Sequence, residues 1–582
     1  MIPPHAPFTP EQSASLSAFL SSFTPEQNTW LSGFLAGRAP QQASAPANLT
    51  VVYGTESGNS EALADRTVKT AKKKGVKASM LNLADLKPAD LAKHDNLAVI
   101  ISTWGDGEPP ETAEGFFEAF NKEELDLKGK RFTVCALGDT SYEKFCEMGK
   151  IFDERLEKFG AERITAREDC DVDFDDSYAA WADRLFAELG SSSVVVGDFG
   201  SVAAAVTTEY SKKNPFPSEV LDHVMLNGER SEKETMHVEL SLEGSGLDYE
   251  AGDALAVVPN NCKEVVADLL KATGFSGSEE VVLKGDEKTT VAEAFASKLD
   301  ITALSRAIVK KYEALSPNAD LAMLLDDDSK EEFKEWIWGR QIIDLVETYP
   351  IKDLTAQQFV SILRKLPPRL YSIASSPKAH PGEVHLTVAA VRYDGHGKAR
   401  KGVASTFLAD EAKTGEKISV YVHKNKNFRL PESDEAPIIM VGPGTGIAPF
   451  RAFVEERAER GAKGESWLLF GDQKYSYDFL YQLEWQDHLK EGSLTKLDVA
   501  FSRDQPEKYY VQDVMRENAT ELYAWLEKGA SFYVCGDAER MAKDVHQALI
   551  DIVSVEGELS TEEATAYVDQ LKKDKRYQRD VY

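Results

Sequence analysis

The sequence predicts a multidomain protein of class α/β and β, and three observations lead to this class. Two stretches, from Leu49 to about Gly190 and from about Pro437 onward, alternate apolar strands with helices, which is typical of doubly wound parallel sheets. Between them, strand patterns near His223–Leu242 and after Arg369 indicate a mainly antiparallel β-barrel. A helix-rich insert interrupts that pattern. With 582 residues the chain exceeds one hydrophobic core, so we expect three to five domains.

The boundaries between these parts follow changes in composition and pattern. Residues 191–217 are rich in Ser, Gly, Ala and Val, which is typical of a flexible linker. We therefore expect five parts: an N-terminal helical segment at 1–47, a first α/β domain at 48–190, the linker at 191–217, the barrel at 218–434 with its helical insert at about 263–360, and a second α/β domain at 435–582.

The N-terminal segment contains a short repeat, because Phe8–Gln12 and Phe23–Gln27 both have the sequence FTPEQ. Thr9 and Thr24 are suited to cap helices that begin with proline, and apolar residues follow at helical spacing. Two amphipathic helices this small cannot bury their apolar faces alone. Docking on the main body and assembly with another subunit, which would make the protein a homo-oligomer, both satisfy this need.

The net charge excludes a nucleic-acid partner and leaves two uses for the acidic surface. The chain has a formal net charge of −30, whereas binding to phosphate backbones requires Lys and Arg. Residues 49–190 alone hold 29 acidic against 19 basic side chains, a net charge of −10. Such a surface is either simply well solvated, or it steers a basic protein partner toward this domain.

Five scattered cysteines without a CxxC pair argue against a disulfide framework and against a zinc or iron–sulfur site. We therefore expect no bound metal and a reducing, cytoplasmic location. The first residues lack a basic stretch followed by an apolar run, and nowhere are about eighteen consecutive residues apolar. We expect neither a signal peptide nor a membrane-spanning helix.

The first α/β domain carries a candidate phosphate site at its first strand–helix turn. Its predicted elements are strands at Leu49–Tyr53, Lys77–Leu83, Leu97–Ser102 and Arg131–Leu137 and a helix at Glu61–Lys74. The turn at 55–60 reads TESGNS, and hydroxyls with backbone N–H groups at a helix N-terminus bind anions. The turn lacks the GxxxxGK[ST] pattern of a P-loop. A turn of this kind occurs by itself in many proteins without a ligand.

Two later loops follow strands of the same sheet, at 102–105 and 137–142, and ligands bind at that edge of doubly wound sheets. Each loop carries an aromatic residue, Trp104 or Tyr142, that could flank a flat ring. With all three loops together, the domain resembles flavodoxin, which implies bound FMN. The resemblance places the FMN contacts at Thr55, Glu56, Ser57, Gly58, Asn59, Ser60, Ser102, Thr103, Trp104, Gly105, Leu137, Gly138, Asp139, Tyr142, Phe145 and Cys146.

The barrel carries a second ordered set of residues that starts at Arg369. The guanidinium of Arg369 can neutralise a pyrophosphate, Tyr371 offers a stacking face, and Gly402 allows the backbone to approach a phosphate. The set resembles the FAD-binding barrel of the ferredoxin–NADP reductase family. It implies FAD contacts at Arg369, Leu370, Tyr371, Ser372, Thr387, Val388, Ala389, Tyr393, Gly402, Val403, Ala404, Ser405 and Tyr582.

The second α/β domain opens with a glycine-rich turn at 442–450, between a strand at Pro437–Val441 and a helix, where a pyrophosphate can bind. Cations and hydroxyls cluster after a later strand, and a 2′-phosphate needs such groups whereas the ribose of NAD usually meets a carboxylate. NADP is therefore favoured over NAD. The expected contacts are Gly444, Thr445, Ser502, Arg503, Lys508, Tyr509, Tyr510, Val511, Gln512 and Asp544.

The last residues complete a candidate hydride-transfer site. The sequence YVCGD at 533–537 precedes a predicted helix at Ala538–Val553, and the chain ends in RDVY. In the reductase family the matching cysteine lies beside the nicotinamide, and a terminal aromatic residue covers the flavin. The resemblance therefore implies catalytic roles for Ser372, Cys535, Asp580 and Tyr582.

The order of these parts resembles the diflavin reductase family over more than nine-tenths of the chain. The segment NKNFRLP at 425–431, the ending RYQRDVY and the FTPEQ helices are most similar to the flavoprotein (alpha) subunits of assimilatory NADPH–sulfite reductases. That resemblance implies electron flow from NADPH to FAD to FMN. The implied acceptor is a sirohaem, iron–sulfur hemoprotein (beta) subunit that reduces sulfite to sulfide.

Two further hypotheses remain open at this stage. Trp104 stands where many sulfite reductase subunits have a less aromatic residue, so a soluble NADPH–cytochrome or haem-protein reductase with another acceptor is the alternative. An FMN-dependent binding module with a regulatory NADP domain is a third possibility. The intact set of hydride-site residues disfavours it.

Overall fold

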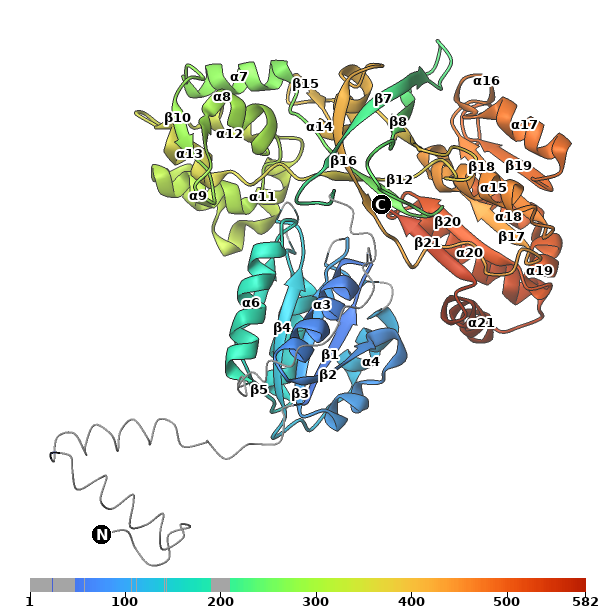
Figure 1. The fold of residues 1–582 in the computed structure, drawn as a ribbon, viewed down its shortest axis with the longest axis horizontal. Helices are drawn as coiled ribbons and strands as arrows, with labels where there is room; N and C mark the ends of the chain where they lie inside the picture. Colours follow the sequence, from blue (N-terminus) through green and yellow to red (C-terminus); the bar gives the residue numbers. More distant parts are fainter. Residues whose placement is uncertain are drawn as a thin grey trace, which may run out of the picture.

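The computed structural model describes Thr24 and residues 48–56, 58–105, 107–110, 113–140, 142, 144–189 and 210–582. The predicted N-terminal helices, apart from Thr24, and most of the predicted linker lie outside these residues. Figure 1 shows four parts: a first α/β part (48–189, blue to cyan), a barrel, an insert within the barrel sequence (263–362), and a C-terminal α/β part (from 437, orange to red). No helix among the described residues is both long and apolar enough to cross a membrane.

The first α/β part is a parallel sheet in the order β2-β1-β3-β4-β5, with β6 also paired to β4. Helices α3 and α6 pack on one face and α4 and α5 on the other, which confirms the predicted doubly wound sheet. Apolar strands buried on both faces produce this arrangement. The elements are β1 (Asn48–Gly54), α3 (Asn59–Lys73), β2 (Lys77–Asn82), β3 (Asn96–Ser102), α4 (Glu114–Lys122), β4 (Arg131–Leu137), α5 (Glu147–Lys158), β5 (Glu162–Arg163), β6 (Glu168–Cys170) and α6 (Asp175–Glu188).

The barrel is a six-stranded antiparallel sheet in the order β12-β9-β16-β7-β8-β13. An antiparallel bridge between Ile373 and Leu386 links its first and last strands. The alternating apolar side chains of the strands fill its interior. The elements are β7 (Phe216–Met225), β8 (Thr235–Ser241), β9 (Ala254–Val258), β12 (Arg369–Ser372), β13 (Glu383–Ala389), the hairpin β14 (Arg392–Gly395) and β15 (Lys398–Lys401), α14 (Val403–Asp410) and β16 (Lys417–His423).

The insert between β9 and β12 is mainly helical and has its own apolar core. It contains one short hairpin, which the sequence pattern did not indicate. The elements are α7 (Lys263–Thr273), β10 (Glu280–Val282), β11 (Lys288–Thr290), α8 (Val291–Glu293), α9 (Arg306–Leu315), α10 (Ala319–Leu324), α11 (Lys330–Ile337), α12 (Ile342–Thr348) and α13 (Ala356–Ile362).

The C-terminal α/β part is a second parallel sheet in the order β19-β18-β17-β20-β21. Helices α15 and α17 pack on one face and α18 to α21 on the other. The elements are β17 (Ile438–Val441), the 3₁₀ turn η6 (Gly444–Ile447), α15 (Ala448–Arg460), β18 (Ser466–Asp472), α16 (Tyr475–Asp478), α17 (Gln482–Glu491), β19 (Lys496–Phe501), α18 (Val511–Glu517), α19 (Ala519–Glu527), β20 (Ser531–Gly536), α20 (Met541–Glu556), α21 (Thr561–Lys573) and β21 (Tyr577–Val581).

Three element boundaries differ from the sequence expectation. The stretch expected as strand from His223 to Leu242 is two strands, because Asn227 accepts the N–H of Thr235 through Oδ1 and closes a turn (2.7 Å). Helix α20 begins at Met541, since the Asp537 carboxylate accepts backbone N–H groups at 540 and 541 and holds the preceding residues in a turn. Strand β7 begins at Phe216, inside the predicted linker.

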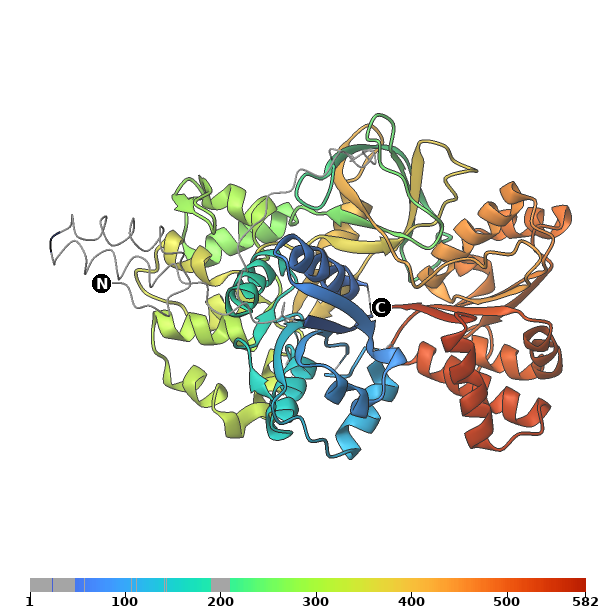
Figure 2. The same ribbon diagram turned by 60° about the horizontal axis from the view of Figure 1, so that its bottom comes forward.

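Figures 1 and 2 both show the first α/β part beside the insert and beside the C-terminal α/β part. Asp139 follows the end of β4 and forms an ion pair with Arg364 of the insert side (2.7 Å). The carboxyl ends of the first sheet therefore face the insert, and this is the edge that carries the candidate FMN loops.

Candidate functional site

The first predicted phosphate turn connects β1 to α3 and has the features of an anion site. Gly58 is the N-cap with φ +82°, a left-handed conformation that favours glycine. The Ser60 and Ser102 hydroxyls are buried and have no hydrogen-bond partner among the described residues. Buried hydroxyls usually have a hydrogen-bond partner. A phosphate that accepts from Ser60 and from N–H groups at the start of α3 would be such a partner. Thr55, Glu56 and Asn59 lie in the same turn, and Ser57 lies outside the described residues.

The second and third loops meet beside this turn. The N–H of Thr103 donates to Leu137 O (2.9 Å), and the Thr103 hydroxyl accepts the N–H of Met148 (3.1 Å). Gly138 lies so close to the next helix that an added Cβ would be 2.8 Å from the backbone N of Cys146. The structure thus brings Ser102–Gly105, Leu137–Asp139 and Cys146 together at one sheet edge.

The two aromatic residues predicted to flank FMN are accessible. Tyr142 is 59% exposed and Trp104 is half-buried, with Phe145 half-buried between the loop and α5. Both rings border the three loops and leave part of their faces open. A flat ring held by the three loops would cover them.

The barrel presents Arg369 and Leu370 as exposed residues on β12, followed by the half-buried Tyr371 and Ser372. The barrel also has a tight turn at Gly402. The N–H of Gly402 donates to Val391 O (2.8 Å), and the Ser405 hydroxyl accepts the N–H of Val391 (3.1 Å). This turn opens α14, so its free N–H groups form a second anion cradle, with Val403 and Ala404 in the first helical turn.

The remaining predicted FAD residues lie on β13 and on the β14 hairpin. Thr387 is buried and its hydroxyl lies 2.6 Å from Tyr481 Oη, and Val388 belongs to the barrel core. Backbone atoms are therefore the groups that these two residues can offer to FAD. Ala389 is half-buried at the strand end, and Tyr393 is 46% exposed.

The four predicted catalytic residues converge where the barrel meets the C-terminal α/β part. The Ser372 hydroxyl of β12 donates to Asp580 Oδ2 (2.5 Å), and Cys535 Sγ lies 3.9 Å from the same oxygen. Cys535 and Asp580 are neighbours on β20 and β21. Burial raises the pKa of the Asp580 carboxyl and the pKa of the Cys535 thiol. The hydroxyl of the 56%-exposed Tyr582 lies 2.9 Å from Thr445 Oγ1.

The glycine-rich turn of the C-terminal α/β part packs directly under this cluster. Gly444 has φ +58°, and a Cβ added to Gly446 would lie 2.1 Å from the carbonyl oxygen of Cys535. The turn is thereby pressed against the end of β20, which holds Cys535, the predicted catalytic cysteine. A pyrophosphate on this turn would place the rest of a dinucleotide beside Cys535.

The predicted 2′-phosphate residues follow β19 and open α18. The N–H of Ser502 donates to Asp472 O (2.9 Å), and Arg503 is 43% exposed by side chain and pairs with Glu232 (2.9 Å). Lys508 and Tyr510 are exposed, Val511 is the buried first residue of α18, and Gln512 lies 3.4 Å from Asp544 Oδ2. The Tyr509 hydroxyl instead donates to Glu517 (2.6 Å).

Lys233 is a candidate site residue that the sequence did not reveal. Its Nζ lies 2.7 Å from both carboxylate oxygens of Asp472 and faces the glycine-rich turn, 3.7 Å from a Cβ built on Gly444. A cation in this place is suited to a dinucleotide pyrophosphate. Lys233 lies in the β7–β8 turn of the barrel, and no motif there signals its approach to residues more than 200 positions later.

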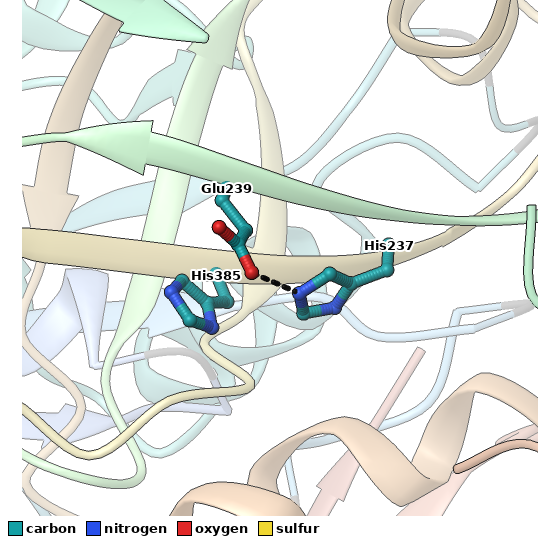
Figure 3. Close-up of side chains that lie close together, drawn as sticks. All are labelled: His237, Glu239 and His385. Atoms are coloured by element: carbon teal, nitrogen blue, oxygen red, sulfur yellow. Dashed lines mark hydrogen bonds and ion pairs between the residues drawn. The ribbon is translucent and has the colours of Figure 1, made fainter. Parts of the chain in front are cut away.

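A buried histidine cluster joins the barrel to the C-terminal α/β part (Figure 3). His237 Nε2 lies 3.2 Å from Glu239 Oε1, and His237 Nδ1 lies 2.9 Å from Tyr481 Oη. His385 packs edge-on against His237, with ring centres 5.1 Å apart. Burial lowers the pKa of His237 to about 4, so this imidazole is neutral at neutral pH.

The contacts of His385 disfavour a metal ion at its Nε2. Arg451 Nη1 lies 3.3 Å from His385 Nδ1 and can only donate, so that nitrogen accepts and Nε2 carries the proton toward Glu383 (3.1 Å). A metal at Nε2 would require the other tautomer, with an N–H facing the guanidinium. Burial and Arg451 lower the pKa of His385 to about 2.

Comparisons with known proteins agree with this arrangement. A flavodoxin family model matches residues 51–184, a model described as FAD binding domain matches 208–407, and a model described as oxidoreductase NAD-binding domain matches 440–547. These matches confirm the predicted fold class. The chain is 48% identical over 548 residues to the NADPH sulfite reductase flavoprotein alpha-component of Bacillus subtilis (strain 168), covering 93% of this chain and 91% of that protein.

Proteins with the same name in other bacteria are similarly related. The chain is 43% identical to that of Vibrio cholerae (serotype O1, strain El Tor Inaba N16961), covering 93% of this chain and 88% of the relative. It is 42% identical to that of Shewanella sp. (strain MR-7), covering 93% and 90%. Similarity of this extent runs through all three parts that carry the candidate sites.

Proposed function

Because this chain belongs to the family of NADPH sulfite reductase flavoprotein alpha-components, we propose that it supplies electrons for the reduction of sulfite to sulfide. Electrons enter from NADPH and pass through FAD and FMN to a separate sirohaem, iron–sulfur hemoprotein (beta) subunit. The observation that supports this proposal best is that Ser372, Cys535 and Asp580 lie in contact beside the glycine-rich turn proposed to bind NADP. The ion pair between Asp139 and Arg364 also turns the FMN loops toward the barrel and its insert.

When bound, FAD accepts a hydride from NADPH and releases single electrons, which FMN relays onward. The protein's part is to bind, orient and shield these groups. Asp580 holds the Ser372 hydroxyl in one orientation, with Cys535 packed beside it. Tyr582 shields the same place. Two backbone hydrogen bonds, to Gly536 and from Ala538, hold its main chain, while its ring makes one hydroxyl contact with Thr445 and can move aside when the nicotinamide arrives.

We also propose a cytoplasmic location, because all five cysteines are free thiols, which suits a reducing compartment. Assembly into a homo-oligomer through the segment 1–47 is also proposed, on the strength of its two amphipathic repeats. The native mass of the chain with and without residues 1–40 tests that assembly, and an unchanged mass would refute it.

NADPH should be preferred over NADH because of Arg503. Replacing Arg503 by Gln should raise the KM for NADPH about 10- to 100-fold, since one charge-assisted bond to the 2′-phosphate is lost. The KM for NADH should stay within about twofold, since NADH lacks that phosphate. Steady-state kinetics with both nucleotides check this. Arg516→Gln, which removes an arginine of α18 that is not among the predicted NADP contacts, is the matched control.

The proposed function is tested by reconstitution. The flavin-loaded chain is mixed with a sirohaem hemoprotein, and NADPH-dependent formation of sulfide is measured. Sulfide in proportion to NADPH consumed is the expected result. Rapid reduction of cytochrome c without sulfide would overturn the assignment of the acceptor and favour a haem-protein reductase instead.

A further inference from the structure

The first α/β part meets the rest of the chain through its carboxylates. Six ion pairs join described residues of this part to described residues after 210, and in each of the six the carboxylate belongs to the first α/β part. The pairs are Asp139–Arg364, Asp173–Lys365, Asp175–Lys212, Asp176–Lys284, Glu61–Lys426 and Glu108–Lys543. In these six pairs the first α/β part supplies the acidic groups and the rest of the chain supplies the basic groups.

One of the six pairs involves an arginine and has the shortest separation, 2.7 Å, while the other five involve lysine at 3.3 to 3.9 Å. Arg364 and Asp139 side chains are 17% and 29% exposed, and Nη1 donates to Oδ1 at 2.7 Å. The pair Lys284–Asp176, in contrast, is 85% and 80% exposed and separated by 3.7 Å. Exposed pairs of that kind contribute little, whereas a partly buried charge-assisted hydrogen bond contributes more.

Contacts with Asp300, outside the first α/β part, hold Arg364 in its orientation. Its Nε and Nη2 donate to Asp300 Oδ2 (3.0 and 2.9 Å), and its carbonyl accepts the N–H of Asp300 (2.9 Å). The other oxygen of Asp300 accepts from Thr302 and Ala303, so the carboxylate cannot turn away. The remaining guanidinium nitrogen, Nη1, is thereby aimed at Asp139 alone.

Both ends of the contact lie next to flavin-site segments. Asp139 belongs to the loop at 137–142, which is held on its other side where Asp171 accepts the N–H and the hydroxyl of Thr140 (3.0 and 2.6 Å). Arg364 precedes Arg369, the first residue of β12, by five positions. A single side chain therefore joins the FMN loop to the segment that leads into the FAD strand.

We propose that Arg364 is a positioning residue that seats the FMN loop against the FAD half of the molecule for internal electron transfer. The proposal rests on the proposed function, because it concerns the step in which one electron leaves reduced FAD and reduces FMN. The other five pairs, four of which include a largely exposed lysine, add a salt-sensitive attraction around this contact. When the Asp139–Arg364 contact breaks, the carboxylates of the first α/β part become free to bind an outside acceptor.

The test uses the full chain loaded with both flavins, and the variant is Arg364→Gln. Rapid mixing with NADPH separates a first phase, reduction of FAD, from a second phase, reduction of FMN. We expect an unchanged first phase and a second phase slowed about 10-fold, because a charge-assisted hydrogen bond is lost from the docked state. At low salt, small-angle X-ray scattering should give a larger radius of gyration for Arg364→Gln than for the unaltered chain. The unaltered chain should reach that larger value only at high salt.

Two further variants separate positioning from a merely structural effect. Arg364→Lys keeps the charge but cannot bond both carboxylates, so its second phase should fall between those of the unaltered chain and the Gln variant. Lys284→Gln removes an exposed pair on the same face and should leave both phases within about twofold. The second phase of the unaltered chain should slow as salt is raised, and that of Arg364→Gln should respond less.

The outcomes distinguish this proposal from the proposed function. If Arg364→Gln retains FMN and shows the second phase and the radius of gyration of the unaltered chain, the positioning role is overturned. If the Gln variant does not fold, the Lys variant decides by the same two measurements. If the unaltered chain shows no first phase, the proposed function itself fails, whatever Arg364 does.

Discussion

Replacing Asp580 by Asn should slow the reduction of FAD by NADPH by about 10²- to 10³-fold, the size of effect seen when one preorganised polar group is removed from an active site. Asp580 accepts the Ser372 hydroxyl at 2.5 Å and touches the Cys535 thiol at 3.9 Å, so one carboxyl fixes both neighbours. The Asn amide keeps one acceptor oxygen, has an N–H donor in place of the other oxygen, and carries no charge. Rapid mixing with NADPH, followed by flavin absorbance, measures the effect.

The pH profile of the same phase provides a second measurement. Burial raises the pKa of Asp580 above its ordinary value, so on acidification this carboxyl protonates at a higher pH than a free one. The rate of the unaltered chain should therefore fall on the acid side through that raised pKa, and the Asn variant should lack this step. Asp574→Asn, an exposed carboxylate at the end of α21, is the control. An Asp580→Asn chain with the rate and pH profile of the unaltered chain would contradict the assigned role.

Replacing Gly446 by Ala should reduce NADPH-dependent reduction of FAD by about 100-fold, because displacement of about 1 Å in an active site has effects of this size. The added Cβ would lie 2.1 Å from Cys535 O and 3.2 Å from Gly536 Cα, and both are backbone atoms that cannot rotate away. The turn and the end of β20 must move apart. That movement would disturb the proposed pyrophosphate turn and Cys535 together, so the KM for NADPH should rise while the rate falls.

Gly115→Ala provides the control, since its added Cβ meets no atom within 4 Å and lies in α4 of the first α/β part. FAD and FMN contents of the Gly446→Ala chain should match those of the control, because neither flavin site includes this turn. Normal kinetics in Gly446→Ala would show that the turn does not support Cys535 as the structure indicates.

The sequence was sufficient to predict those parts of the fold that depend on local pattern. Apolar strands alternating with helices predicted both parallel sheets, and the three FMN loops follow directly from β1, β3 and β4. The convergence of Ser372, Cys535 and Asp580 was implied by family resemblance, and the structure brings them into contact. Boundaries were less accurate where one side chain decides them, as Asp537 does at the start of α20.

Contacts between distant segments could not be predicted from local pattern. Lys233 approaches Asp472, and Arg364 approaches Asp139, without any periodicity or motif that announces the pairing. Thr387 was expected at the FAD site, yet its hydroxyl contacts Tyr481 across the interface with the C-terminal α/β part. Each of these contacts depends on how the parts pack, a property that strand and helix patterns do not encode.

The path from NADPH through FAD to FMN is tested most directly by removing one flavin at a time. Chain depleted of FMN should still show NADPH-dependent bleaching of its FAD at the rate of the fully loaded chain. Chain that holds FMN but no FAD should show no bleaching with NADPH, because the proposed hydride-site residues Ser372, Cys535 and Asp580 lie in the barrel and the C-terminal α/β part and not among the FMN loops. Reduction of FMN by NADPH in the FAD-free chain would contradict the account.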